Sequence, residues 1–84
     1  MLSQLKTAAK VVGIKQSKKI IRDGDAEKVF IAQDAEQRII GPITELCQAS
    51  GVEIVEVSSM KELGAAAGIA VGAAVVTVTK ENGF

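Results

Sequence analysis

The sequence contains no histidine, tryptophan or tyrosine, and only one cysteine, one proline and two phenylalanines among its 84 residues. The absence of histidine removes the commonest general base and the commonest metal ligand. The single cysteine, Cys47, excludes a disulfide framework within the chain and favours a reducing compartment. With so few aromatic residues, the core must be built from Ile, Val, Leu and Ala, which is typical of β-branched strands packed against Ala-rich helices.

The sequence also lacks a long apolar run. The most apolar region, residues 63–78, is interrupted by Gly64, Gly68 and Gly72, and is too short to span a bilayer. Residues 1–6 lack the apolar core of a signal peptide. We therefore expect a cytoplasmic protein without a membrane segment. A chain of this length predicts one domain over residues 1–84, and we expect it to be a monomer.

The net charge is zero, but the charges are segregated along the chain. Residues 1–24 hold six basic residues and one acidic residue, a net charge of +5. Residues 25–84 hold four basic and nine acidic residues, a net charge of −5. Such asymmetry allows one positive face for phosphate groups. A lysine-rich helix face that is simply solvated explains the same composition equally well.

Apolar spacing predicts helices that alternate with strands. Leu5, Ala8, Ala9 and Val12 recur at helical spacing, which predicts an opening helix with Ser3 as its N-cap. Three further helices are predicted: one over 15–23 that ends at Gly24, one that starts at Asp34, and one that follows the Ser59 capping box. Three strands are predicted over 29–32, which should be buried, over 52–57 and over 73–79. Alternation of this kind predicts an α/β fold, a three-layer α/β/α sandwich with a short mixed sheet.

Two features of the middle of the chain need separate predictions. Asp34, followed three residues later by Gln37, is the pattern of a helix N-cap. Gly41-Pro42 is expected to interrupt that helix, with Pro42 as the first residue of a second segment that Gly51 closes.

No enzyme signature is present. Cys47 lies on an apolar helical stripe with Ile43 and Leu46, which predicts a core residue rather than a nucleophile. Asp34 is explained by its capping role. The glycines at 64, 68 and 72 have neither dinucleotide-binding nor P-loop spacing, and indicate tight loops and close packing. We expect a protein that is not an enzyme and needs no metal or cofactor.

The segment Gly13-Ile14-Lys15-Gln16-Ser17-Lys18-Lys19 carries chemistry of another kind. It places a glycine before a helix start, where free N–H donors and the positive end of the helix dipole attract phosphate. Lysine donates to the N7 and O6 atoms of guanine, and glutamine both donates and accepts at a base edge. Lysines near a helix start are common, so this segment alone does not decide the function.

Three blocks together resemble the kink-turn-binding ribosomal proteins of the L-seven-Ae family, in particular the short bacterial members of the YbxF type. The blocks are Gly13–Lys19 with Gly24 and Ala26 beyond it, Val29-Phe30-Ile31-Ala32-Gln33-Asp34, and Ser59–Ile69 with its Leu63-Gly64 and Gly68-Ile69 pairs. The resemblance covers nearly the whole chain. It implies binding to kink-turn RNA, in which consecutive sheared G·A pairs adjoin a sharply bent bulge.

The resemblance also implies a role for each residue of the site. Gly13 allows close approach, Ile14 follows it, Lys15 and Gln16 face the bases, Lys19 contacts guanine or the backbone, and Ser17 and Lys18 hold phosphates. The loop Ala67-Gly68-Ile69-Ala70-Val71 packs on an extruded nucleotide, in keeping with the rule that specific RNA recognition targets unstacked elements. The partner is then ribosomal RNA or a structured messenger RNA.

Archaeal members carry Asn-Glu where this chain has Lys15-Gln16. Asparagine is a good N-cap and lysine a poor one, so we expect a less well terminated helix start. The alternative function is a protein-interaction or ribosome-assembly factor with the same fold and little direct RNA binding, since nine acidic residues in the rest of the chain would repel phosphate.

Overall fold

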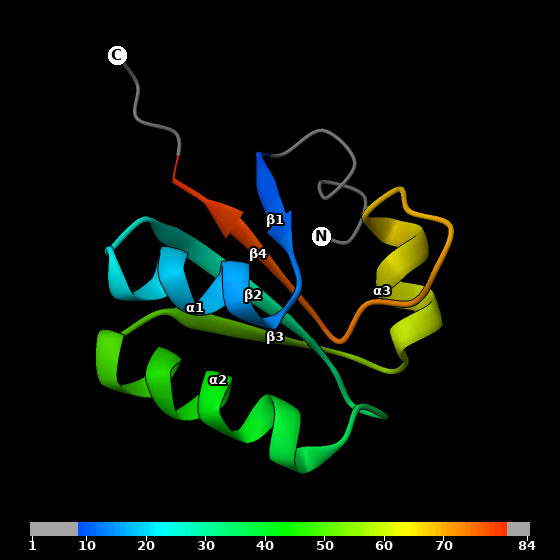
Figure 1. The fold of residues 1–84 in the computed structure, drawn as a ribbon, viewed down its shortest axis with the longest axis horizontal. Helices are drawn as coiled ribbons and strands as arrows, with labels where there is room; N and C mark the ends of the chain where they lie inside the picture. Colours follow the sequence, from blue (N-terminus) through cyan, green and yellow to red (C-terminus); the bar gives the residue numbers. More distant parts are fainter. Residues whose placement is uncertain (1–8, 81–84) are drawn as a thin grey trace.

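The computed structural model describes residues 9–80. The elements in chain order are β1 (Lys10–Val12), α1 (Ile14–Arg22), β2 (Ala26–Ala32), α2 (Gln37–Ser50), β3 (Glu53–Val57), α3 (Met60–Ala66) and β4 (Val75–Thr79). The strands form one sheet in the order β1-β4-β2-β3, in which β2 and β3 are parallel and the other pairs antiparallel. Helices α1 and α2 cover one face and α3 the other, which confirms the predicted α/β/α sandwich with a mixed sheet (Figure 1).

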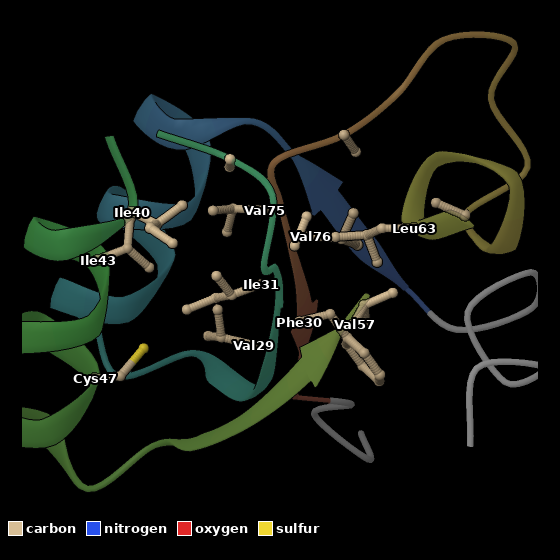
Figure 2. Packing of buried hydrophobic residues seen from close by; sticks show 14 of the residues in the cluster. Val29, Phe30, Ile31, Ile40, Ile43, Cys47, Val57, Leu63, Val75 and Val76 are labelled. Carbon is tan, nitrogen blue, oxygen red and sulfur yellow. The ribbon is translucent and has the colours of Figure 1, made fainter. Parts of the chain in front are cut away.

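The core lies on both faces of the sheet. Side chains buried on the α1 and α2 side include Val29, Ile31, Ile40, Ile43, Cys47 and Val75, and those on the α3 side include Phe30, Val57, Leu63 and Val76 (Figure 2). Because the central strands are buried on both faces, β2 contains the continuous apolar run Val29–Ala32, and β4 consists only of valine and threonine. Cys47 is fully buried, as predicted, and burial raises the pKa of its thiol from the ordinary value of 9.0.

The predicted opening helix is wrong where the structure describes it. Lys10–Val12 form strand β1, which pairs with β4 through Lys10–Val78, Val11–Thr77 and Val12–Val76; the earlier part of that prediction lies outside the described residues. Two β-branched valines favour a strand, and pairing with β4 outweighs a helical spacing of only four apolar positions. The sheet therefore has a fourth strand that the sequence did not predict.

The predicted break at Gly41-Pro42 is also wrong. Helix α2 runs without interruption from Gln37 to Ser50, with Pro42 inside it. The residue before a proline is normally kept out of the helical region by contact between its Cβ and the proline ring, and Gly41 has no Cβ. Ile40, Ile43 and Cys47 lie on either side of the proline and are all buried, so packing holds the two parts as one helix.

The predicted helix ends agree with the structure. Gly24 follows α1 with φ of +78° and Gly51 follows α2 with φ of +71°, the left-handed conformation that stops a helix. Within residues 9–80, no helix has the length and apolarity needed to cross a membrane.

Candidate nucleic-acid interface

Helix α1 begins at the end of the sheet, and its start is fixed to β4. Gly13 is the N-cap residue, with φ of +112° and ψ of +165° and no side-chain hydrogen bond at the cap. Its N–H donates to the carbonyl oxygen of Val75 at 3.0 Å, and its carbonyl accepts the Ser17 N–H at 3.1 Å. The N–H groups of Ile14, Lys15 and Gln16 precede this first helical bond, so they form the positive end of the helix.

The identity of the cap corrects one expectation. Lys15 is the second residue of α1 and does not occupy the cap position, which belongs to Gly13. A lysine at residue 15 therefore does not replace a capping side chain. Gly13 instead allows a backbone conformation that other residues rarely adopt, and a Cβ at this position would have no heavy atom within 4 Å.

The predicted site residues of α1 differ in exposure. Lys15, Gln16 and Lys19 are exposed, whereas Ile14 and Lys18 are half-buried. Three exposed polar side chains thus lie on the first turns of α1, beside its free N–H groups.

Ser17 does not belong to this surface. Its side chain is 0% exposed, and the hydroxyl has no hydrogen-bond partner among the described residues. A phosphate contact by that hydroxyl is incompatible with this burial, so the role predicted for Ser17 is wrong. Its position agrees with its place on the same helical face as buried Ile21.

Lys18 points to a different side of α1. It lines a groove between α1 and α2 together with Arg22 and the α2 residues Pro42, Glu45, Leu46 and Ala49. Lys18 and Arg22 are one helical turn apart and form a second pair of positive charges on α1. The positive surface of α1 consequently extends along the helix beyond its first turn.

The predicted loop follows helix α3 through a regular helix-ending motif. The Gly68 N–H donates to the Ala65 carbonyl at 3.1 Å, and the Ile69 N–H donates to the Gly64 carbonyl at 3.0 Å. This pair of bonds is a Schellman motif, which requires the left-handed conformation that Gly68 adopts with φ of +82°. The chain therefore leaves α3 in a defined direction.

Further contacts fix the rest of the loop against α3. Gly64 lies so close to the carbonyl oxygen of Val71 that a Cβ at residue 64 would collide with it. The Ala73 N–H donates to the Met60 carbonyl at 3.0 Å. Gly72 packs against Met60 in the same way, since a Cβ there would lie 3.2 Å from the Met60 Cβ. The predicted close packing at Gly64 and Gly72 is thus confirmed.

Asp34 takes part in this arrangement, in a role that the sequence did not predict. Helix α2 has Glu36 as its N-cap residue, without a side-chain hydrogen bond, so the prediction that Asp34 caps α2 is wrong. The Asp34 Oδ1 atom instead accepts the Met60 N–H at 2.8 Å, at the start of α3. The predicted Ser59 cap is confirmed, because Ser59 Oγ accepts the Glu62 N–H at 3.1 Å. Asp34 therefore links the turn after β2 to α3, across 26 residues of sequence that no local pattern spans.

Exposure divides the loop residues into two groups. Ala67 is 5% exposed and Ile69 is half-buried, and both pack against the hydrophobic core, which anchors the loop. Gly68, Ala70 and Val71 are exposed, and Val71, at 71% exposure, is one of only two large apolar side chains exposed among the described residues. The apolar contact surface of the loop therefore centres on Ala70 and Val71, and not on Ala67.

Strand β4 brings the two blocks together. The loop leads directly into β4, whose first residue, Val75, accepts the hydrogen bond from Gly13. Figure 1 shows the start of α1 and the end of the orange loop meeting at the start of β4. The start of α1 and the end of the segment that follows α3 thus meet at β4, although Gly13 and Val75 are more than sixty positions apart in the sequence.

The structure thus defines an α/β/α protein with a basic helix start joined to β4 and an exposed aliphatic loop that leads into the same strand. The family described as "Ribosomal protein L7Ae/L30e/S12e/Gadd45 family" matches residues 2–84, and the chain belongs to it. This is the L-seven-Ae family that the sequence motifs indicated.

Individual relatives agree with this assignment. The chain is 45% identical over 65 residues to an RNA-binding protein of Caldanaerobacter subterraneus, covering 77% of this chain and 79% of that protein. It is 39% identical over 70 residues to RNA-binding protein YbxF of Geobacillus stearothermophilus, covering 83% and 85%. Among solved structures, the 15.5 kDa RNA-binding protein of Giardia lamblia superposes with a TM-score of 0.89 at 29% identity, covering 98% of this chain and 72% of that one.

Proposed function

We propose that this protein binds RNA through the surface formed by the start of α1 and the loop 67–71, and that the RNA is a kink-turn. The observation that carries the proposal is the Gly13–Val75 hydrogen bond, which joins the start of α1 to the strand into which loop 67–71 leads. Relatives that share 45% and 39% of aligned residues bear the name RNA-binding protein. The nine acidic residues that favoured the alternative all lie outside α1, which contains no Asp or Glu.

The exposed residues of α1 supply base contacts in this proposal. Lys15, Gln16 and Lys19 are exposed next to the free N–H groups of the first turn, where a guanine edge presents N7 and O6 as acceptors. Gln16 offers both a donor and an acceptor, so it is the residue best suited to distinguish bases. Lys18 and Arg22 lie further along α1 and contact the phosphate backbone, which contributes affinity without sequence specificity.

The loop supplies the apolar contact. Ala70 and Val71 present aliphatic surface to a nucleotide that the bend of the RNA leaves unstacked, while Ala67 and Ile69 hold the loop on the core. A regular duplex has no such nucleotide, and its deep groove does not admit a helix start. Preference for a bent, bulged RNA follows from the combination of both contacts.

The cellular setting is part of the same proposal. The description of the family names ribosomal proteins, which favours a kink-turn of ribosomal RNA. A kink-turn of a structured messenger RNA is the other candidate. The protein binds it as a monomer in the cytoplasm.

A gel-shift titration tests the proposal. The protein is titrated with a kink-turn duplex and with a duplex of equal length whose G·A pairs are replaced by Watson–Crick pairs. We expect the kink-turn to bind at least tenfold more tightly. Gln16→Ala should reduce this preference, because a base contact of this kind contributes about 1–3 kcal/mol. Gln48→Ala, an exposed glutamine on α2, is the matched control and should change nothing.

Two results would decide against it. Equal affinity for both duplexes would show non-specific attraction between lysines and phosphate. No binding to either RNA would favour the protein-interaction or assembly factor with the same fold.

A further inference from the structure

Strand β3 has an unpaired edge. It lies at the end of the sheet and pairs with β2 alone; within residues 9–80 no strand borders its other side. The Val57 carbonyl accepts the Gln33 N–H at 2.7 Å, so the backbone groups of Val57 face β2. Because backbone direction alternates along a strand, the N–H and C=O groups of Ile54 and Glu56 face outward.

This edge borders a groove. A hollow of about 640 Å³ lies between β3 and α2, which run next to each other in Figure 1. Gln37, Thr44 and Gln48 line it from α2, one above the other at intervals of seven and four residues. Ile54 and Glu56 line it from β3. The groove thus offers amide groups, an aliphatic surface and unpaired backbone to an extended chain.

The charge of this edge is negative. Glu53 and Glu56 line the groove and no lysine or arginine does. Lys28 approaches Glu53 at 4.0 Å, but the Glu53 side chain stays 60% exposed, and within residues 9–80 no cation lies within 4.0 Å of Glu56. Phosphate is therefore repelled here, in contrast to α1. A second copy of β3 would bring four carboxylates into one short ribbon, and such like charges oppose pairing.

The order of residues along the edge specifies the partner further. Glu53-Ile54-Val55-Glu56 reads acid, aliphatic, aliphatic, acid, and reads the same in both directions. A strand paired with it places one side chain opposite each of these residues. Complementarity requires a cation opposite each glutamate and aliphatic groups between them, whether the guest strand is parallel or antiparallel.

We propose that the outer edge of β3, with the α2 groove, binds an extended segment of a partner protein with the pattern cation-aliphatic-aliphatic-cation. The segment adds a strand to the sheet through the backbone of Ile54 and Glu56. Strands β4 and β2 separate this edge from β1, and α1 is fixed to β4, so the segment and an RNA at α1 bind together.

The test uses the full-length ¹⁵N-labelled protein and a capped peptide that contains Lys-Val-Val-Lys. We expect the amide signals of Ile54 and Glu56 to shift on titration and their hydrogen exchange to slow at least tenfold. A peptide with Glu-Val-Val-Glu in the same frame should have no effect. Glu56→Gln should weaken peptide binding several-fold. Glu45→Gln removes an exposed carboxylate that lies outside the groove between β3 and α2, and should leave peptide binding unchanged.

Glu56→Pro separates strand addition from simple charge attraction. The N–H of Glu56 faces outward, so a proline at this position removes the hydrogen-bond donor offered to the partner segment and leaves the hydrogen bonds between β3 and β2 in place. We expect binding to be lost while the thermal unfolding transition persists; if this variant does not fold, the exchange rates and Glu56→Gln carry the test. Four results would each overturn the proposal: no shift in β3, shifts that occur only in α1, shifts that depend on protein concentration without peptide, or shifts caused by kink-turn RNA and not by the peptide.

Discussion

The close approach of Gly64 to the Val71 carbonyl makes Gly64→Ala a sensitive test of how the loop is held. Gly64 is the fifth residue of α3, and alanine is favoured over glycine inside a helix by about 1 kcal/mol. Helix propensity alone therefore predicts that the variant is more stable. The added Cβ, however, would collide with a backbone oxygen that has no flexible side chain to move aside. The two effects have opposite signs, so the measured sign decides between them.

The magnitude follows from the same two terms. Overpacking a tightly packed site costs about 1–3 kcal/mol, and a backbone obstacle places this case at the upper end. Subtracting a propensity gain of about 1 kcal/mol leaves a net destabilisation of about 2 kcal/mol. For a chain of this size, that loss lowers the midpoint of thermal unfolding by roughly 8–16 °C.

The assay is thermal unfolding followed by circular dichroism, with RNA binding as a second readout. Ala65→Gly, at the next and exposed position of α3, is the control, and should cost up to about 1 kcal/mol through propensity alone. Gly64→Ala should also weaken kink-turn binding, because the displaced carbonyl belongs to Val71. A Gly64→Ala variant with a raised midpoint and unchanged RNA affinity would refute the idea that this contact positions the loop.

Further outcomes can be measured on the same protein. RNA affinity should fall with salt with a log–log slope of about −2 to −4, and Lys18→Ala should make the slope shallower while Lys80→Ala, at the far end of β4, should not. Val71→Ser should lower kink-turn affinity with no change in that slope, since its contact is apolar. Because burial raises the pKa of the Cys47 thiol, this thiol loses its proton at a higher pH in the folded state than in the unfolded state. Above about pH 9 the unfolded wild type is therefore stabilised by deprotonation, which Cys47→Ala cannot undergo. The stability difference between the wild type and Cys47→Ala, measured by urea unfolding, should shrink in that range. A constant difference up to pH 10 would contradict this linkage.

Local patterns in the sequence predicted most of the fold. The apolar run Val29–Ala32 and the glycines after α1 and α2 indicated elements whose cause lies within a few residues, and these agree with the structure. Strand β1 was missed because its stability comes from pairing with β4, more than sixty residues away. The helix break predicted at Pro42 failed because the absence of a Cβ at Gly41 and burial on both sides of the proline outweigh a local rule.

The candidate site likewise has some features that local sequence patterns predict and others that depend on distant contacts. The motif predicted the helix start and the loop, but not which side chains are exposed: Ser17 and Ala67 are buried, while Val71 is prominent. Helical spacing relates Ser17 to buried Ile21, a signal within the sequence that places Ser17 on the inner face. The bond between Asp34 and the Met60 N–H had no such signal, because it joins segments that only the completed fold brings together.

The backbone bonds that fix the start of α1 and the loop determine which partner changes shape on binding. Gly13 is tied to β4, Ala73 to the start of α3, and that start to Asp34. In the proposed kink-turn complex, a surface held in this way needs no rearrangement, so the free energy of bending falls on the RNA. The apparent dissociation constant is then the intrinsic one divided by the fraction of RNA already bent. Magnesium ions, which screen the phosphates of a sharp bend, should therefore strengthen binding to this protein even though added salt weakens it.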